Sequence, residues 1–110
     1  MKLLENKVAI ITGGSRGIGK GIVDVFTANG CNVAFTYNSS DEKARAVEAE
    51  FANRGVTVKG YKSNAALMSD CEELVKNVIT DFETISVVVN NAGITKDNLL
   101  MRMTEEAWDD

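Results

Sequence analysis

The stretch Val8-Ala-Ile-Ile-Thr-Gly-Gly-Ser-Arg-Gly-Ile-Gly19 decides how the rest of this 110-residue sequence is interpreted. It opens with a short run of apolar and β-branched residues, which is typical of a strand covered on both faces. Glycines then lead into apolar residues at helical spacing, namely Ile18, Ile22, Val25 and Phe26. Asn29-Gly30 supplies the residues that end a helix. The stretch therefore predicts a strand, a tight turn and a helix.

The same alternation continues along the chain. Further strands are predicted at Asn32–Tyr37, Thr57–Lys62 and Ile85–Val89, with helices opened by the capping boxes Ser39-x-x-Glu42 and Ser69-x-x-Glu72. Parallel strands need helical crossovers of this kind. We therefore predict an α/β fold, a Rossmann-type doubly wound parallel sheet that is incomplete, with about four strands and flanking helices. The alternative, an antiparallel α+β domain, lacks hairpin turns of the Asn-Gly type between the strands.

Apolar spacing also predicts which faces of the later helices are buried. The residues predicted to be buried are Ala44, Val47 and Phe51 in the second helix, and Leu74, Val75, Val78, Ile79 and Phe82 in the third. Gly55 is expected to stop the second helix.

Composition and charge exclude several classes of protein. Hydrophobic residues make up 45% and charged residues 25%, as in globular proteins. The 16 acidic residues outnumber 12 scattered basic ones, which argues against a nucleic-acid or anionic-membrane partner. No signal peptide or membrane span is found in the sequence. Cys31 and Cys71 lie far apart and histidine is absent, so we expect no metal site, no histidine-based catalysis and a cytoplasmic location.

The glycine turn has the composition of a phosphate-binding loop. Gly13 permits a sharp turn out of the strand, Gly17 lets the backbone approach a pyrophosphate, and Gly19 lets the helix pack closely on the sheet. The N–H groups of the first helical turn and the helix dipole favour an anion, and Arg16 lies in the loop. The turn therefore predicts dinucleotide binding, and the alternative is a glycine-rich surface turn with no ligand.

A nucleotide-hydrolysing loop fits less well. Gly14-x-x-x-x-Gly19-Lys20 nearly matches a Walker A loop, but Gly21 stands where a magnesium-binding Ser or Thr is needed. The predicted fourth strand is followed by Asn90-Asn91 rather than by an aspartate. We therefore disfavour a nucleoside triphosphatase.

The glycine turn and Asn90-Asn-Ala-Gly93 together resemble the short-chain dehydrogenase/reductase family. The first motif, Thr-Gly-x-x-x-Gly-Ile-Gly, follows the first predicted strand, and the second follows the fourth. The stretch from Gly93 to Trp108 is similar to the bacterial 3-oxoacyl-[acyl-carrier-protein] reductases of fatty-acid biosynthesis. The resemblance implies NADPH-dependent reduction of 3-oxoacyl-[acyl-carrier-protein] to the 3-hydroxyacyl form, a homotetramer, and an NAD(P)-binding Rossmann domain over residues 1–110. Another small carbonyl compound is the alternative substrate.

The resemblance also implies roles for individual residues. Those around the pyrophosphate and the adjoining ribose are Gly13, Gly14, Ser15, Arg16 and Ile18. Asn64 and Ala65 match the pair that meets the adenine, and the alternative for Asn64 is a plain turn residue. Asn91, Ala92 and Gly93 border the ribose on the nicotinamide side, and Asn90 ties the fourth strand to its neighbours.

The end of the second strand decides which cofactor is bound. An acid there accepts the ribose 2′-hydroxyl of NAD and repels a 2′-phosphate. This sequence has Asn38 and Ser39, with no acid until Asp41 and with Arg16 near. We therefore expect NADP rather than NAD.

Some positions depart from the family's pattern. Glu83 stands where a helix-ending glycine is usual, Ser86 where an aspartate is common, and Leu67 where an acid often follows Asn64, so we expect looser local structure there.

The family's catalytic Tyr-x-x-x-Lys is absent, because Asp41 follows Tyr37 at that spacing and Ala65 follows Tyr61. We assign no catalytic residue and expect the 110 residues alone to be inactive and to bind cofactor weakly. We interpret the domain as truncated after the fourth strand and the start of the next helix. The alternative is an inactive module that at most binds nucleotide.

Overall fold

The structure is a computed structural model, which describes residues 3–15, 17–64 and 67–91. The elements follow in the order β1 Val8–Ile11, α1 Gly17–Ala28, β2 Asn32–Tyr37, α2 Asp41–Phe51, the short 3-10 helix η1 Ala52–Arg54, β3 Val58–Lys62, α3 Met68–Phe82 and β4 Val87–Val89. The strands pair in parallel in the order β3-β2-β1-β4, with Ile10 opposite Ala34 on β2 and Val88 on β4. The predicted parallel α/β sheet is confirmed.

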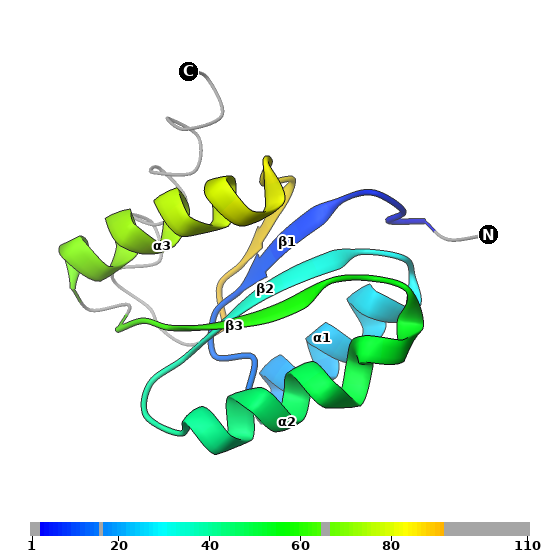
Figure 1. Ribbon diagram of the computed structural model, residues 1–110, viewed down its shortest axis with the longest axis horizontal. Helices are drawn as coiled ribbons and strands as arrows, with labels where there is room; N and C mark the ends of the chain where they lie inside the picture. Colours follow the sequence, from blue (N-terminus) through cyan, green and yellow to red (C-terminus); the bar gives the residue numbers. More distant parts are fainter. Residues whose placement is uncertain (1–2, 16, 65–66, 92–110) are drawn as a thin grey trace.

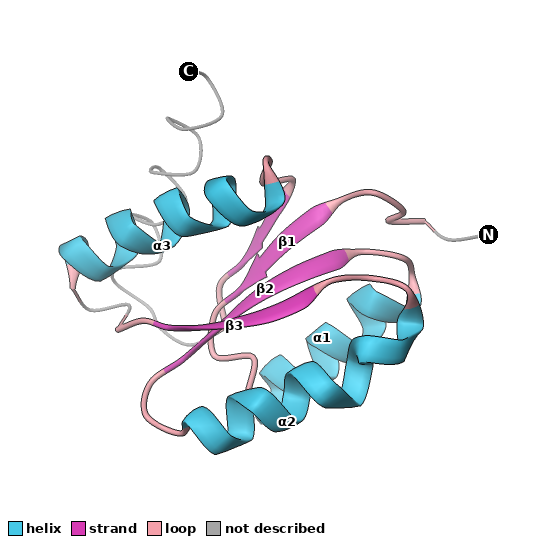
Figure 2. Ribbon diagram, in the orientation of Figure 1, coloured by secondary structure: helices cyan, strands magenta, loops and turns pink. Residues whose placement is uncertain are grey.

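The sheet lies between two layers of helix. Figure 1 and Figure 2 show α1 and α2 on one face and α3 on the other. Helices on both faces explain why β1 reads as a continuous apolar run, since all four of its residues are buried. The sheet is therefore doubly wound, as predicted.

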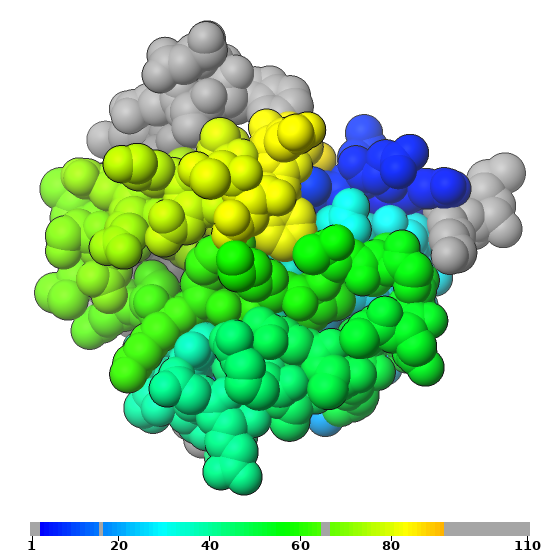
Figure 3. Space-filling model, viewed as in Figure 1, coloured from blue at the N-terminus to red at the C-terminus, as the bar shows by residue number. Residues whose placement is uncertain are grey.

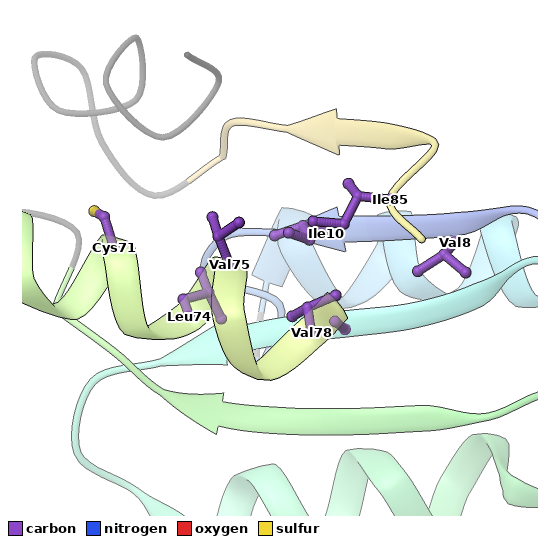
Figure 4. Packing of buried hydrophobic residues seen from close by; sticks show 8 residues of the cluster. Val8, Ile10, Cys71, Leu74, Val75, Val78 and Ile85 are labelled. Atoms are coloured by element: carbon purple, nitrogen blue, oxygen red, sulfur yellow. The ribbon is translucent and has the colours of Figure 1, made fainter. Parts of the chain in front are cut away.

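The core has two halves because side chains alternate between the faces of a strand. On the α3 face, Ile10 and Ala34 belong to one buried cluster with the predicted residues Leu74, Val75 and Val78 (Figure 4). On the opposite face a second buried cluster holds Ile11, Val33 and Phe35 from the sheet, with Val23 from α1 and Ala44, Val47 and Phe51 from α2. Each fully buried valine, isoleucine, leucine or phenylalanine side chain contributes about 1.5–3 kcal/mol to the free energy of unfolding.

Of the apolar positions that predict α1, Ile22 and Phe26 are half-buried against the second cluster, but none is fully buried. The buried residues of α1 are Gly19, Val23 and Thr27, whereas Ile18 is 78% and Val25 is 59% exposed. The reason is a close contact of the helix start with the glycine turn, described below.

The start of α2 lies one residue later than predicted. Ser40, rather than Ser39, is the N-cap, and its Oγ accepts a hydrogen bond from the Lys43 N–H (3.2 Å). The predicted stop at Gly55 is confirmed, with φ 77° after the intervening turn η1. The capping box failed by one position because three candidate caps, two serines and an aspartate, follow Asn38 in succession.

The start of α3 differs more strongly from the prediction. The helix begins at Met68, its N-cap is Leu67, and that residue makes no side-chain capping hydrogen bond, so the capping box at Ser69 is wrong. The acid of the first turn, Asp70, instead accepts the N–H of Asn64 (2.7 Å). A side chain inside the helix thus holds the loop before it.

The end of α3 carries an unusual backbone conformation. Glu83 has φ 74°, the left-handed region, and its N–H closes the helix by donating to the Ile79 carbonyl (2.8 Å). An L-residue in this conformation costs roughly 1–2 kcal/mol, which glycine avoids. Glu83 therefore adopts the geometry that a helix-ending glycine would supply.

The outer edge of β3 is closed by side chains of α2. The Gly60 N–H donates to Glu48 Oε2 (2.7 Å), and Arg45 Nη2 donates to the Gly60 carbonyl (3.3 Å). The Gly60 position has no room for a Cβ, which would lie 2.7 Å from the Phe35 ring. Figure 3 shows the atoms of β3 and α2 forming a continuous surface along this edge.

Candidate functional site

The glycine turn lies at the carboxyl end of the sheet, where β1, β2 and β4 end together. In open α/β sheets this is the end at which ligands bind. The Gly13 N–H donates to Thr36 Oγ1 (3.0 Å), and the Gly14 N–H donates to the Thr36 carbonyl (3.1 Å). The turn is therefore fixed against the last residues of β2.

Each glycine of the motif meets a different constraint. Gly13 has φ 70° and Gly17 has φ 60°, conformations that favour glycine. A Cβ on Gly19 would lie 2.0 Å from the Gly13 carbonyl oxygen, so α1 can start here only without a side chain. A Cβ on Gly17 would meet nothing within 4 Å, which leaves open space beside the backbone. The sharp turn predicted at Gly13 and the close packing predicted at Gly19 are both visible.

Gly14 has a further constraint that sequence reasoning missed. Its added Cβ would lie 2.6 Å from Phe35 Cβ and 3.2 Å from Val23 Cγ2. The turn is therefore pressed into the core as well as bound to β2. Only the three-dimensional packing reveals this, because Phe35 lies on a different strand.

The Asn-Asn motif meets the glycine turn directly. Thr12 donates its N–H to the Val89 carbonyl (3.1 Å), and its Oγ1 accepts the N–H of Asn91 (2.8 Å). Asn91 Nδ2 then donates to the Gly13 carbonyl (3.3 Å). The tie that the sequence assigned to Asn90 is therefore made by Asn91, while Asn90 is exposed. The reason is register, since Asn91 is the residue that reaches the level of Gly13.

The end of β2 carries the residues expected to select the cofactor. Asn38 and Ser39 are exposed, and Asp41 is the first acid after the strand. Tyr37 Oη donates a hydrogen bond to Asp41 Oδ1 (2.8 Å), and this bond raises the pKa of Tyr37. This pair was not predicted from the sequence. The pattern Tyr-x-x-x-Asp at a strand-to-helix junction could have indicated it.

The remaining predicted residues are placed only in part. The Ser63 N–H donates to the Tyr37 carbonyl (3.0 Å), so the chain leading to Asn64 runs beside the end of β2. The Asn64 carbonyl accepts the Leu67 N–H (3.0 Å), as in a turn. Ser15 is half-buried and Ile18 is exposed. Arg16, Ala65, Ala92 and Gly93 lie outside the described residues.

Both tyrosine hydroxyls are held by carboxylates. Tyr61 Oη donates to Asp81 Oδ2 (2.6 Å), and Lys59 Nζ lies 2.7 Å from the same oxygen. Burial and this hydrogen bond raise the pKa of Tyr61, as the bond to Asp41 raises that of Tyr37. A tyrosine acting as general acid needs a lowered pKa. Neither described tyrosine therefore suits that role.

Other kinds of site find no support in the described ranges. No group of three His, Cys, Asp or Glu is placed there to hold a metal. Cys31 and Cys71 are buried free thiols, and burial raises the pKa of Cys31 to about 11, which disfavours the reactive thiolate. None of the helices in these ranges combines the length and apolar character needed to cross a bilayer.

These features define the class of protein: a parallel α/β sheet with a glycine turn at its carboxyl end, pinned to an asparagine after the fourth strand. The family model described as short chain dehydrogenase matches residues 7–110. The chain belongs to the short-chain dehydrogenase family.

Curated relatives show which members of this family the chain is similar to. The chain is 48% identical over 105 residues to the 3-oxoacyl-[acyl-carrier-protein] reductase of Staphylococcus epidermidis, covering 96% of this chain and 43% of the relative. It thus spans less than half the length of such relatives.

Similar solved structures include complexes with NADP and with NAD. A short chain dehydrogenase from Burkholderia cenocepacia in complex with NADP is 38% identical with a TM-score of 0.78, over 83% of this chain and 37% of that one. A 3-oxoacyl-[acyl-carrier protein] reductase from Brucella melitensis in complex with NAD is 30% identical with a TM-score of 0.83, over 92% and 48%.

Proposed function

We propose that this chain forms the NAD(P)-binding Rossmann domain, residues 1–110, of an NADPH-dependent 3-oxoacyl-[acyl-carrier-protein] reductase of fatty-acid biosynthesis. The observation that carries the proposal is the hydrogen-bonded junction of the glycine turn with Asn91. Identity of 48% to a reductase with this activity supports the substrate class. The enzyme would be a homotetramer and cytoplasmic.

The geometry of the turn fits a dinucleotide pyrophosphate. The backbone at Gly17 borders open space, and the N-terminus of α1 favours an anion there. We assign the pyrophosphate and the adjoining ribose to Gly13, Gly14, Ser15, Arg16, Gly17, Ile18 and Gly19. Asn64 and Ala65 would meet the adenine, and Asn91, Ala92 and Gly93 the ribose on the nicotinamide side. The bound cofactor would supply the hydride that reduces the 3-oxo carbonyl.

A preference for NADPH is supported by the end of β2. Asn38 and Ser39 offer amide and hydroxyl donors to a 2′-phosphate, and the first acid, Asp41, is already engaged by Tyr37. Solved relatives bind NADP in one case and NAD in another, so the choice depends on local residues.

Cofactor binding is tested by titrating the isotope-labelled chain with NADPH and following backbone amides by NMR. We expect weak binding, with shifts centred on Gly13, Gly14 and Gly17. Gly17→Ala places a methyl group in the open space and is expected to reduce the affinity. Gly55→Ala is the matched control, because Gly55 also has a positive φ (77°) and its added Cβ also meets nothing within 4 Å, but it follows η1 rather than lying in the glycine turn. Equal affinities in the two variants would contradict the assignment.

The reductase proposal is tested with a chimera. Residues 1–110 replace the matching part of the Staphylococcus epidermidis relative, and oxidation of NADPH is followed with an acetoacetyl thioester. We expect activity in the chimera and its loss on Gly17→Ala. A folded chimera that binds NADPH without turnover would overturn the assigned activity.

A second candidate function is an inactive module that only binds nucleotide. The observation favouring it is that both tyrosines are bound to carboxylates and neither precedes a lysine at the required spacing. The 110-residue chain alone is therefore expected to give no turnover of the thioester. NADPH oxidation by the chain alone would contradict this expectation.

A further inference from the structure

Both the ring and the hydroxyl of Tyr37 have defined contacts. It is the last residue of β2, is 8% exposed, and packs against Phe35 with ring centroids 6.5 Å apart. Its hydroxyl nevertheless reaches out of the core to Asp41 Oδ1, 2.8 Å away. The core thus fixes the ring, and the ring fixes the position of one carboxylate.

This contact lies next to the candidate cofactor site. Thr36, the residue before Tyr37, holds both Gly13 and Gly14. Asn38 and Ser39, the residues after it, are exposed at the same edge. Asp41 is the first residue of α2. The Tyr37–Asp41 hydrogen bond therefore lies in the same segment as the residues proposed to meet a 2′-phosphate.

We infer that Tyr37 is a positioning residue that gives the site its preference for a 2′-phosphate, by holding the Asp41 carboxylate away from the cofactor. The inference rests on the proposed function. A free carboxylate at this edge accepts a ribose 2′-hydroxyl and repels a 2′-phosphate. With its Oδ1 bound to Tyr37 and its backbone fixed in the first turn of α2, the Asp41 carboxylate is held in one position and has one oxygen already occupied.

The neighbouring cation does not replace Tyr37 in this role. Arg45 Cζ lies 6.0 Å from the centroid of the Tyr37 ring, but its Nη2 is directed to the Gly60 carbonyl (3.3 Å) and to Glu48 Oε2 (3.3 Å). The Arg45 guanidinium is therefore bound at the edge of β3. The Asp41 carboxylate, in contrast, accepts its hydrogen bond from Tyr37.

The test is Tyr37→Phe, which keeps the ring and removes the hydroxyl. Dissociation constants for 2′,5′-ADP and 5′-AMP, which differ only in the 2′-phosphate, are measured by NMR titration of the full 110-residue chain. We expect binding of 2′,5′-ADP to weaken by about three- to tenfold, the size of a shifted charge near the surface, while that of 5′-AMP stays equal or tightens. Adding Asp41→Asn is expected to abolish the loss, because the repelling charge is gone.

The matched control is Tyr61→Phe. It removes a second tyrosine hydroxyl that is bound to a carboxylate, Asp81, away from the glycine turn on β3. Both dissociation constants are expected to stay unchanged in this variant.

Failure of the inference is distinct from failure of the proposed function. A wild-type chain that binds neither ligand overturns both. A wild-type chain that binds 2′,5′-ADP, with Tyr37→Phe weakening both ligands equally or with the loss persisting in the double variant, overturns the inference alone. Should Tyr37→Phe not fold, Asp41→Asn alone decides: with the tyrosine intact it is expected to change the ratio of the two constants less than about threefold, and a larger change contradicts the inference.

Discussion

The two ends of β1 are both tied to the chain around β4, yet they tolerate change very differently. At the amino end the Val8 N–H donates to Ser86 Oγ (3.1 Å) and the Val8 carbonyl accepts the Ser86 N–H (2.7 Å). At the carboxyl end Thr12 and Asn91 are joined by a chain of hydrogen bonds, and Gly19 leaves no room for a Cβ. The amino end is joined by hydrogen bonds alone, whereas the carboxyl end combines hydrogen bonds with a close backbone contact at the candidate site.

The family's usual residues are replaced at the tolerant end. Glu83 takes a conformation suited to glycine, and Ser86 joins the strands with a hydroxyl and its backbone. At the carboxyl end the glycines and Asn91 follow the family motif. The close backbone contacts of this chain thus lie where it follows the motif, and its departures lie where side-chain and backbone hydrogen bonds join the elements.

Gly19→Ala is expected to have the largest effect and tests the close backbone contact at the carboxyl end of β1. The new Cβ would lie 2.0 Å from the Gly13 carbonyl oxygen, so the turn or the helix must move. We expect a loss of about 3 kcal/mol in the free energy of unfolding and loss of NADPH binding. Urea denaturation measures the first and NMR titration the second. Gly21→Ala is the control, expected to be stabilising by up to about 1 kcal/mol because it improves helix propensity.

Ser86→Ala probes the amino end. The variant leaves the Val8 N–H without its hydroxyl acceptor, which is expected to cost about 1–1.5 kcal/mol in the free energy of unfolding. Cofactor affinity is expected to stay unchanged, since the site lies at the opposite end of β1. A reduced affinity in the folded variant would show that the two ends are coupled.

Asn91→Ala probes the carboxyl end without overpacking it. It removes the donor to the Gly13 carbonyl, a long hydrogen bond of 3.3 Å, and is expected to cost about 0.5–1 kcal/mol. The loss of cofactor affinity is expected to exceed that of Ser86→Ala despite the smaller change in stability. A larger loss of cofactor affinity in Ser86→Ala than in Asn91→Ala would contradict the distinction between the two ends.

Glu83→Gly is the smallest change and the only one of these four expected to stabilise. It relieves the left-handed conformation at φ 74°, for a net gain of about 0.5–1 kcal/mol after the greater flexibility of unfolded glycine is counted. A higher urea midpoint with unchanged affinity is the expected result. A lower midpoint would mean that the Glu83 side chain stabilises the helix end by more than its backbone strain costs.

The sequence predicted what local patterns determine. The apolar runs and their spacing located every described strand and α-helix, the residues that α2 buries, and Leu74, Val75 and Val78 on α3. The 3-10 helix η1 and the burial of Cys71 were not predicted. On α1, Ile22 and Phe26 pack against the core as predicted, but the fully buried Gly19, Val23 and Thr27 were not among the predicted positions, because the contact of Gly19 with Gly13 depends on the three-dimensional fold. Helix starts were displaced where several capping residues compete or where Asp70 bonds to the preceding loop.

The candidate site was predictable as motifs but not as a geometry. The glycine turn and the Asn-Asn motif are both visible in the sequence, whereas the choice of Asn91 over Asn90 as the tie depends on strand register. The Tyr37–Asp41 contact depends on where α2 starts, and the predicted start was wrong by one residue.

The closure of Gly60 by Arg45 and Glu48 has a consequence for behaviour in a crowded cell. An open strand edge is a template on which another chain can polymerise, and newly made α/β proteins are vulnerable to this before they finish folding. At β3 the outward amide and carbonyl of Gly60 are already occupied by charged groups of the helix that precedes the strand in the chain. This side of the sheet thus carries its own protection against misassembly, available as soon as α2 and β3 have formed.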